Sequence, residues 1–259
     1  MSNQTAKYTI TVTFIMCLVA SVLVAGSAVM LRPHQEANKA LDFQKNVLKV
    51  AGMYQEGVPV SDQFAKIQVK IVDLQSGKFI EADTADIAKF DQIASAKKPG
   101  QYDRINPEDD IAKLINREKR AKVFLVNDDA GNLSRVILPV RGKGLWSTMA
   151  GFIALDKDLN TILGFGFYSH AETPGLGGEV DNPKWKSIWL EKKVYSDAGD
   201  VKVSVIKGHV DESTPEGEYK VDGLAGATLT STGVNNLVKY WMGDNGFKPF
   251  LTNLKNGEA

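Results

Sequence analysis

The chain opens with a long, uninterrupted apolar run. No charged residue occurs between Lys7 and Arg32, which leaves 24 uncharged residues from Tyr8 to Leu31. A helix of that length is about 36 Å long, and the hydrocarbon core of a bilayer is about 30 Å thick. The run therefore predicts one N-terminal transmembrane helix. The alternative is a cleaved signal peptide, but secretory cores usually span only about 7–15 residues, so the length favours an uncleaved anchor.

A second helical pattern follows the apolar run. Residues 37–51 carry apolar residues at helical spacing: Leu41, Val47, Leu48 and Ala51. Gly52 comes directly after them and is a typical helix stop. We expect this helix to continue outward from the membrane.

Alternating and paired apolar segments predict strands further along the chain. Ile67, Val69 and Ile71 alternate with polar residues, which indicates a half-buried strand. Residues 123–126 and 136–138 flank a polar, Gly-containing loop and predict a hairpin. A second hairpin is expected from residues 151–155 and 161–168. Residues 81–120 are mixed and charged and support no definite prediction.

A last helix is indicated near the C-terminus. Apolar residues recur at positions i, i+3, i+4 and i+7: Val234, Leu237, Val238 and Trp241. Thr230, Ser231 or Thr232 can cap this helix. Together these elements predict an α+β fold, with a mostly antiparallel sheet, flanking helices and the N-terminal transmembrane helix.

Composition removes several classes of function. The chain has 31 basic and 31 acidic residues, so its formal net charge is zero, which argues against a nucleic-acid-binding protein. Three His and one Cys leave little for a metal site, and none is expected. No dinucleotide-binding fingerprint occurs, so this chain is not expected to bind NADH itself. No catalytic acid, base or nucleophile is assigned.

The first candidate site is the loop that follows the second hairpin. Residues 170–178 contain three glycines and a proline, and Glu172 and Thr173 are its hydrogen-bonding side chains next to Pro174. The other members assigned to the site are Gly175, Leu176 and Gly177. Glycine lets backbone approach a flat ligand closely. A purely structural loop is an equally good interpretation of these residues alone.

The second candidate is the Gly-rich segment Asp222 to Ser231, which leads into the last helix. A turn that opens a helix presents unpaired N–H groups, and these favour a phosphate. Thr228 places a hydroxyl at this point, after Gly226 and Ala227. An ordinary capped helix is the alternative.

The second segment resembles the flavinylation motif of bacterial proteins that carry covalent FMN, in which an Asp precedes Gly-Ala-Thr. The loop at 170–178 looks like the other hallmark of that FMN-binding domain. With the upstream segment Gly142 to Trp146, the combination is similar to the C subunits of sodium-translocating NADH:quinone oxidoreductases. One departure is Ala225, where that family often has Ser or Thr.

The resemblance implies that a flavin transferase attaches FMN to Thr228 through a phosphoester. Leu145 and Trp146 lie between the two hairpins and are candidates to cover the flavin ring, and a core tryptophan is an equally good interpretation of Trp146. Linkage through the phosphate leaves the ring free for electron transfer. The implied organisation is a cytoplasmic tail and anchor (1–32), a membrane-proximal helix and α+β part (33–135) and an FMN-binding part (136–259).

The resemblance also implies a place in the cell and a set of partners. The chain is expected in the bacterial inner membrane, with its large domain in the periplasm and with other membrane subunits of the same redox complex as partners. The positive-inside rule, counted literally, favours the opposite orientation, because Lys7 precedes the span while Arg32, Lys39 and others follow it. Two alternatives are the flavin subunit of the ferredoxin-linked Rnf complex and a membrane-tethered, non-catalytic partner-binding module.

Overall fold

The computed structural model describes residues 5–259, which divide into two units after Phe43. Helix α1 (Ala6–Val50) forms the first unit and enters the second. It includes Pro33 without interruption, as expected for one helix that continues beyond the anchor. Among the described residues, α1 is the one helix long and apolar enough to cross a membrane. It ends next to Gly52, whose positive φ of 67° ordinary side chains rarely adopt.

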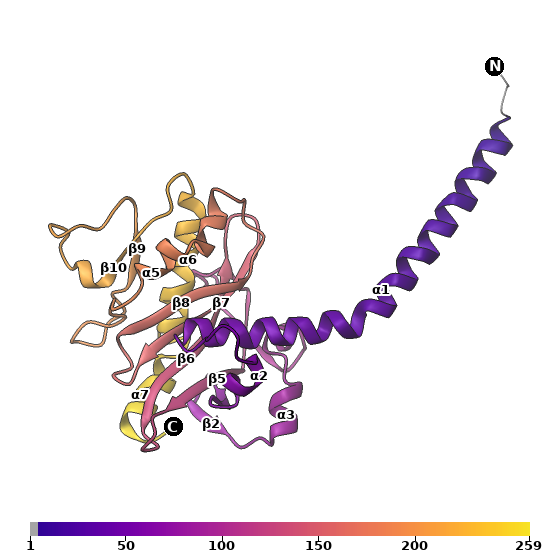
Figure 1. Ribbon diagram of the computed structural model, residues 1–259. Helices are drawn as coiled ribbons and strands as arrows, with labels where there is room; N and C mark the ends of the chain where they lie inside the picture. Colours follow the sequence, from indigo (N-terminus) through magenta and orange to yellow (C-terminus); the bar gives the residue numbers. More distant parts are fainter. Residues whose placement is uncertain (1–4) are drawn as a thin grey trace. The chain divides into compact units, whose positions relative to one another are not determined.

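A six-stranded antiparallel sheet organises the second unit, residues 44–259 (Figure 1). Its order is β2-β1-β5-β6-β7-β8. The strands are β1 (Gln68–Asp73), β2 (Lys78–Ile80), β5 (Arg120–Asn127), β6 (Leu133–Lys143), β7 (Thr148–Asp156) and β8 (Ile162–Ser169). Both predicted hairpins are confirmed, as β5–β6 and β7–β8. The α+β class with a mostly antiparallel sheet is confirmed as well.

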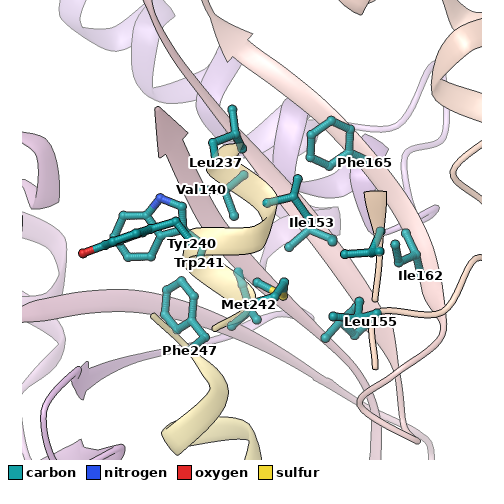
Figure 2. Packing of buried hydrophobic residues seen from close by; sticks show 14 of the residues in the cluster. Val140, Ile153, Leu155, Ile162, Phe165, Leu237, Tyr240, Trp241, Met242 and Phe247 are labelled. Carbon is teal, nitrogen blue, oxygen red and sulfur yellow. The ribbon is translucent and has the colours of Figure 1, made fainter. Parts of the chain in front are cut away.

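The C-terminal helices cover one face of this sheet. Helix α6 (Thr228–Met242) packs along β6, and α7 (Lys248–Asn256) follows it (Figure 1). Figure 2 shows Leu237, Trp241 and Met242 of α6 packed with Val140 and Ile153 of the sheet. The indole N–H of Trp241 donates to the Arg141 carbonyl at 2.7 Å, so even the buried polar atom of this contact is paired.

The end of α1 packs within the second unit. Val47 and Leu48 are fully buried. Gly164 of β8 allows the close approach, because a Cβ at that position would collide with the carbonyl oxygen of Val50. On the strand two places before β8 in the sheet, Arg135 of β6 donates to the Ala51 carbonyl at the end of the helix. A guanidinium at a helix C-terminus is electrostatically favourable.

Short elements fill the segment for which the sequence supported no prediction. They are α3 (Thr84–Lys89), α4 (Gln92–Ser95), β3 (Tyr102–Arg104) and β4 (Asn116–Glu118). A buried ion pair ties β4 and α4 to the sheet: Arg141 Nη2 of β6 lies 2.5 Å from Glu118 Oε2 of β4, and the side chain of Gln92 of α4 donates to Glu118 Oε1 at 2.7 Å. The remaining elements are α2 (Val60–Phe64), η1 (Gly177–Asp181), α5 (Pro183–Ser187), β9 (Ser204–Ile206), η2 (Gly217–Tyr219) and β10 (Lys220–Asp222).

The expected boundaries at 32/33 and 135/136 differ from those of the compact units. Residue 135 lies inside β6, and the sheet takes β1 and β5 from before that point. Since hydrogen-bonded strands on both sides of residue 135 form one sheet, residues 44–259 fold together. The segment 33–135 is therefore split between α1 and this single unit.

Candidate functional site

Thr228 is the first residue of α6 and is exposed. The residue before it, Ala227, is the N-cap, and no side chain of the described residues caps the helix. The expectation that Thr230, Ser231 or Thr232 caps α6 was therefore wrong. These three side chains lie inside the helix, one turn too late for capping. The first-turn N–H groups of α6 thus lack the side-chain acceptor that usually pairs with them.

Glu172 is the most constrained residue of the 170–178 loop. It is only 5% exposed, yet its carboxylate accepts five hydrogen bonds. Oε1 accepts from the backbone N–H groups of Trp146 and Ser147, both at 3.1 Å, and from Ser147 Oγ at 2.9 Å. Oε2 accepts from the Leu145 N–H at 3.1 Å and from Thr230 Oγ1 at 2.7 Å. One side chain thus joins both candidate segments to the β6–β7 connection.

These hydrogen bonds favour the ionised form of Glu172. Burial alone raises the pKa of Glu172, but the hydrogen bonds from Thr230, Ser147 and the Trp146 N–H outweigh it. The pKa of Glu172 is consequently lowered from its ordinary value of 4.5. The carboxylate is ionised at neutral pH, because all five partners donate to it.

Glycines allow the three segments to approach so closely. A Cβ at Gly144 would lie 2.5 Å from Glu172 Oε1, and one at Gly177 would lie 2.5 Å from Thr230 Oγ1. Gly233 of α6 passes next to the carbonyl of Lys143, where a Cβ would collide. In these three places glycine makes room for protein, whereas the sequence pattern assigned the glycines of the loop to a ligand.

Three apolar side chains of the two candidate loops and the β6–β7 connection are exposed. Leu145 is 41% exposed, Trp146 is 67% exposed and Leu176 is 47% exposed. Leu176 reaches Gly226, where an added Cβ would lie 3.3 Å from its Cδ2. Thr173 is exposed, and its carbonyl accepts from the N–H groups of Leu176 and Gly178. The structure thereby joins the two candidate loops that the sequence places about fifty residues apart.

On another side of Thr228 lies an open cleft of about 500 Å³. It is lined by the Gly-rich segment and by the loop after β9, which contributes Lys207 and His209. Asp222 anchors that loop: its carboxylate accepts from the Val210 N–H at 2.8 Å and pairs with His209 Nδ1. Asp222 thus shapes the turn that precedes α6.

The hydrogen bonds of His170 hold the 170–178 loop in place. Its Nε2 lies 2.7 Å from Asp181 Oδ2, and its Nδ1 accepts from the Glu172 N–H at 3.2 Å. Both ring nitrogens are therefore engaged in holding the loop. Sequence reasoning missed Ser147 and His209 as members of this region, and it gave Thr230 only a possible capping role. The one sequence signal that points to Ser147 is its place directly after the apolar pair Leu145 and Trp146.

Comparison with known proteins identifies the family. A relative from Pseudomonas aeruginosa, the C subunit of a Na⁺-translocating NADH-quinone reductase, is 50% identical over the full length of both chains. The chain belongs to the family of these C subunits. A second member, from Haemophilus ducreyi, is 45% identical and covers 98% of this chain and 96% of its own.

Solved structures and a domain family agree with this assignment. The crystal structure of Shewanella oneidensis NqrC matches with a TM-score of 0.78 and 37% identity, covering 85% of this chain and 99% of that one. The corresponding C subunit from Parabacteroides distasonis matches with a TM-score of 0.66 and 28% identity, covering 86% and 97%. An FMN-binding domain matches residues 144–243, a range that contains every residue assigned to the site.

Proposed function

We propose that this chain carries electrons within a membrane-bound, sodium-pumping NADH:quinone reductase, on FMN joined by a phosphoester to Thr228. The observation that supports the proposal most strongly is the position of Thr228. It is an exposed hydroxyl residue at the uncapped start of a helix, at the point where the two candidate loops meet. The names of the relatives favour this complex over the Rnf alternative.

The start of α6 fits a phosphate. The first-turn N–H groups have no capping side chain in the described residues, and the helix dipole adds a partial positive charge there. Gly226 has a positive φ of 72°, which turns the backbone directly before the helix. Ala227 and Gly226 place only a methyl group and a hydrogen next to the proposed phosphoester.

The exposed apolar side chains fit a flat ring. We assign the ring to the exposed side chains of Leu145, Trp146 and Leu176. An aromatic or aliphatic face of this kind gains stability when it is covered. Thr173, Gly175 and Gly177 complete the loop on this side, and Glu172 holds it. FMN, when bound, supplies the electron-accepting and electron-donating chemistry.

Tethering is the main task of the chain's own residues. Thr228 is exposed and the cleft beside it is open to solvent, so a covalent bond keeps the local concentration of the flavin high. A flavin transferase is the partner that forms this bond. The anchor in α1 holds the protein in the bacterial inner membrane beside the other subunits, and we assign the large domain to the periplasm.

The intact mass of Thr228→Ala tests the attachment. The chain should be expressed with a flavin transferase, and the variant should lose the FMN mass and the ultraviolet fluorescence of the denatured protein. Its fold should persist, because losing one exposed hydroxyl changes the free energy of unfolding by about 0.5 kcal/mol or less. Thr232→Ala is the matched control, since Thr232 is exposed one turn later and donates only to the Thr228 carbonyl. Covalent flavin that persists in Thr228→Ala would refute the proposal.

A further inference from the structure

We propose that Glu172 is a positioning residue: its ionised carboxylate holds the tip Gly144–Ser147 against the start of α6 and thereby sets the surroundings of the flavin ring. The carboxylate acts through Leu145 and Trp146 and does not itself touch the ring. This inference rests on the flavin site proposed above. The proposed effect is mechanical: Glu172 acts by holding the tip in place and not by its charge on the flavin.

The occupancy of the carboxylate is the first argument. Its two oxygens already accept five hydrogen bonds, three on Oε1 and two on Oε2. A carboxylate offers about four lone-pair sites, so little acceptor capacity is left for a ligand. Glu172 is also almost entirely buried, beneath Gly144 and Gly177. Both facts indicate that the Glu172 carboxylate binds groups of the protein and not the ligand.

The tip itself is the second argument. Leu145 and Trp146 are exposed, so core packing contributes little to the conformation of the tip. The tip closes on itself through one bond, from the Gly144 N–H to the Ser147 carbonyl at 2.8 Å. Its three following N–H groups all point at Glu172. Ser147 Oγ also accepts from the Ala171 N–H at 2.9 Å, but the backbone N–H groups of Leu145 and Trp146 are held by Glu172.

The connection to α6 is the third argument. Thr230 donates to Oε2 at 2.7 Å from a position two residues after Thr228. Thr230 is buried in the first turn of α6. Its hydrogen bond to Glu172 therefore fixes the position of the tip relative to Thr228, the proposed attachment point. Glu172 thus links the residue that would hold the phosphate to the residues that would contact the ring.

Glu172→Gln is the discriminating variant. A glutamine has nearly the same shape, but its NH₂ group cannot accept. If its oxygen replaces Oε1, the NH₂ meets the Leu145 N–H and the Thr230 hydroxyl. The hydroxyl can turn round and accept, whereas a backbone N–H cannot, so Leu145 loses its partner. The isosteric change should therefore loosen the tip at Leu145.

Amide hydrogen exchange of the full-length protein measures this directly. We expect exchange in residues 144–147 to be about tenfold faster in Glu172→Gln than in the parent chain, because the loss of one hydrogen bond typically has an effect of this size. Glu179→Gln is the matched control, as Glu179 accepts only from Asn182, at 2.8 Å, and should leave the tip unchanged. The same measurement in a Thr228→Ala background makes the result independent of flavin attachment.

A double-mutant cycle on the flavinylated protein tests the effect on the ring. Glu172→Gln should change the visible circular dichroism and the midpoint potential of the flavin more than Glu179→Gln does. In a background of Leu145→Ala with Trp146→Ala, this change should largely disappear, because Glu172 then has no ring-contacting residues to position. Thr230→Val keeps the charge of Glu172 but cuts the link to α6, and should change the dichroism in the parent background.

The results distinguish failure of this inference from failure of the proposed function. Unchanged exchange at 144–147 in Glu172→Gln would overturn the inference, and so would a potential shift that persists when Leu145 and Trp146 are truncated. Should Glu172→Gln fail to fold, Glu172→Asp replaces it: the charge stays, the reach shortens by one methylene, and exchange at the tip must still rise. A chain without covalent flavin would refute the proposed function, while the exchange result would still decide on the positioning role.

Discussion

Four hydroxyl residues lie within five positions at the start of α6, and each has a different environment. Thr228 is exposed, whereas the Thr230 hydroxyl donates to Glu172. Ser231 Oγ accepts from the buried Leu224 N–H at 2.9 Å, and Thr232 donates back to the Thr228 carbonyl. Because successive helical residues point about 100° apart, residues of the same chemistry are sorted to different surroundings. Only Thr228 is left at the helix start for a ligand.

The lowered pKa of Glu172 has a consequence for acid stability. A carboxyl group whose pKa is lower in the folded chain stabilises the fold fully above its ordinary pKa of 4.5, and this contribution is lost as the pH falls through the lowered value. The stability advantage of the parent chain over Glu172→Gln should therefore be constant between about pH 7 and pH 5.5 and shrink below that.

Urea unfolding at a series of pH values measures this advantage. At low pH Glu172 is protonated, and its O–H, like the NH₂ group of glutamine, meets N–H or O–H donors. The free energies of unfolding of the parent and of Glu172→Gln should therefore converge. An advantage of Glu172 that stays constant to the lowest pH would contradict the role of its ionised form.

At the scale of elements, the buried pair of Glu118 and Arg141 joins β4 to the central strand β6. Glu118 is fully buried, so Arg141→Met leaves its charge without a counter-ion and should lower the free energy of unfolding by about 3–5 kcal/mol. Adding Glu118→Leu should restore much of this loss, because an apolar pair does not need solvation.

Chemical denaturation of the two variants and the parent tests this prediction. Lys119→Met is the control: Lys119 lies 3.7 Å from Asp103 on the surface, both side chains are more than two-fifths exposed, and the change should cost less than about 1 kcal/mol. If Arg141→Met costs no more than Lys119→Met, the buried pair does not hold the two elements together.

The elements that could be predicted are those whose pattern is local. The β5–β6 and β7–β8 hairpins were visible because apolar runs flank short polar turns. The segment 81–120 was not, because α3, α4, β3 and β4 contain only three to six residues each and depend on contacts such as that of Glu118 with Arg141. The start of α6 was misjudged since the capping position holds Ala227, which has no capping side chain.

The two loops of the candidate site could be predicted from the sequence, but the way they lie against each other could not. Composition and resemblance selected Glu172 and Thr228, and Leu145 and Trp146 with them. That the carboxylate turns inward could not be foreseen, because its donors lie 25 to 27 residues before it and 58 after it. The orientation of such a group is decided by which segments the sheet brings together.

At the scale of the whole molecule, the end of α1 belongs to the compact unit and not only to the anchor. Deleting residues 1–32 or 1–43 should leave a folded domain with the same melting temperature, since the compact unit begins at Gln44. Deleting residues 1–51 also removes the buried Val47 and Leu48. At about 1.5–3 kcal/mol for each such side chain, this should cost about 3–6 kcal/mol.

Thermal unfolding of the three truncated chains distinguishes these cases. The two shorter deletions serve as controls for each other, because they differ only in residues outside the compact unit. A deletion of 1–51 that melts with the others would mean that the end of α1 packs without stabilising the domain.

The contact between Thr230 and Glu172 also fixes an order of events during synthesis. A growing chain contains the sheet strands and the loop at 170–178 before any part of α6 has been made, because Thr230 follows Glu172 by 58 residues and Trp241 follows Arg141 by 100. Thr228, the acceptor that we propose, enters its site only when α6 has been made and has docked. A transferase that recognises the folded surface around Thr228 must therefore wait for an almost finished chain, and a chain terminated before α6 would never be modified.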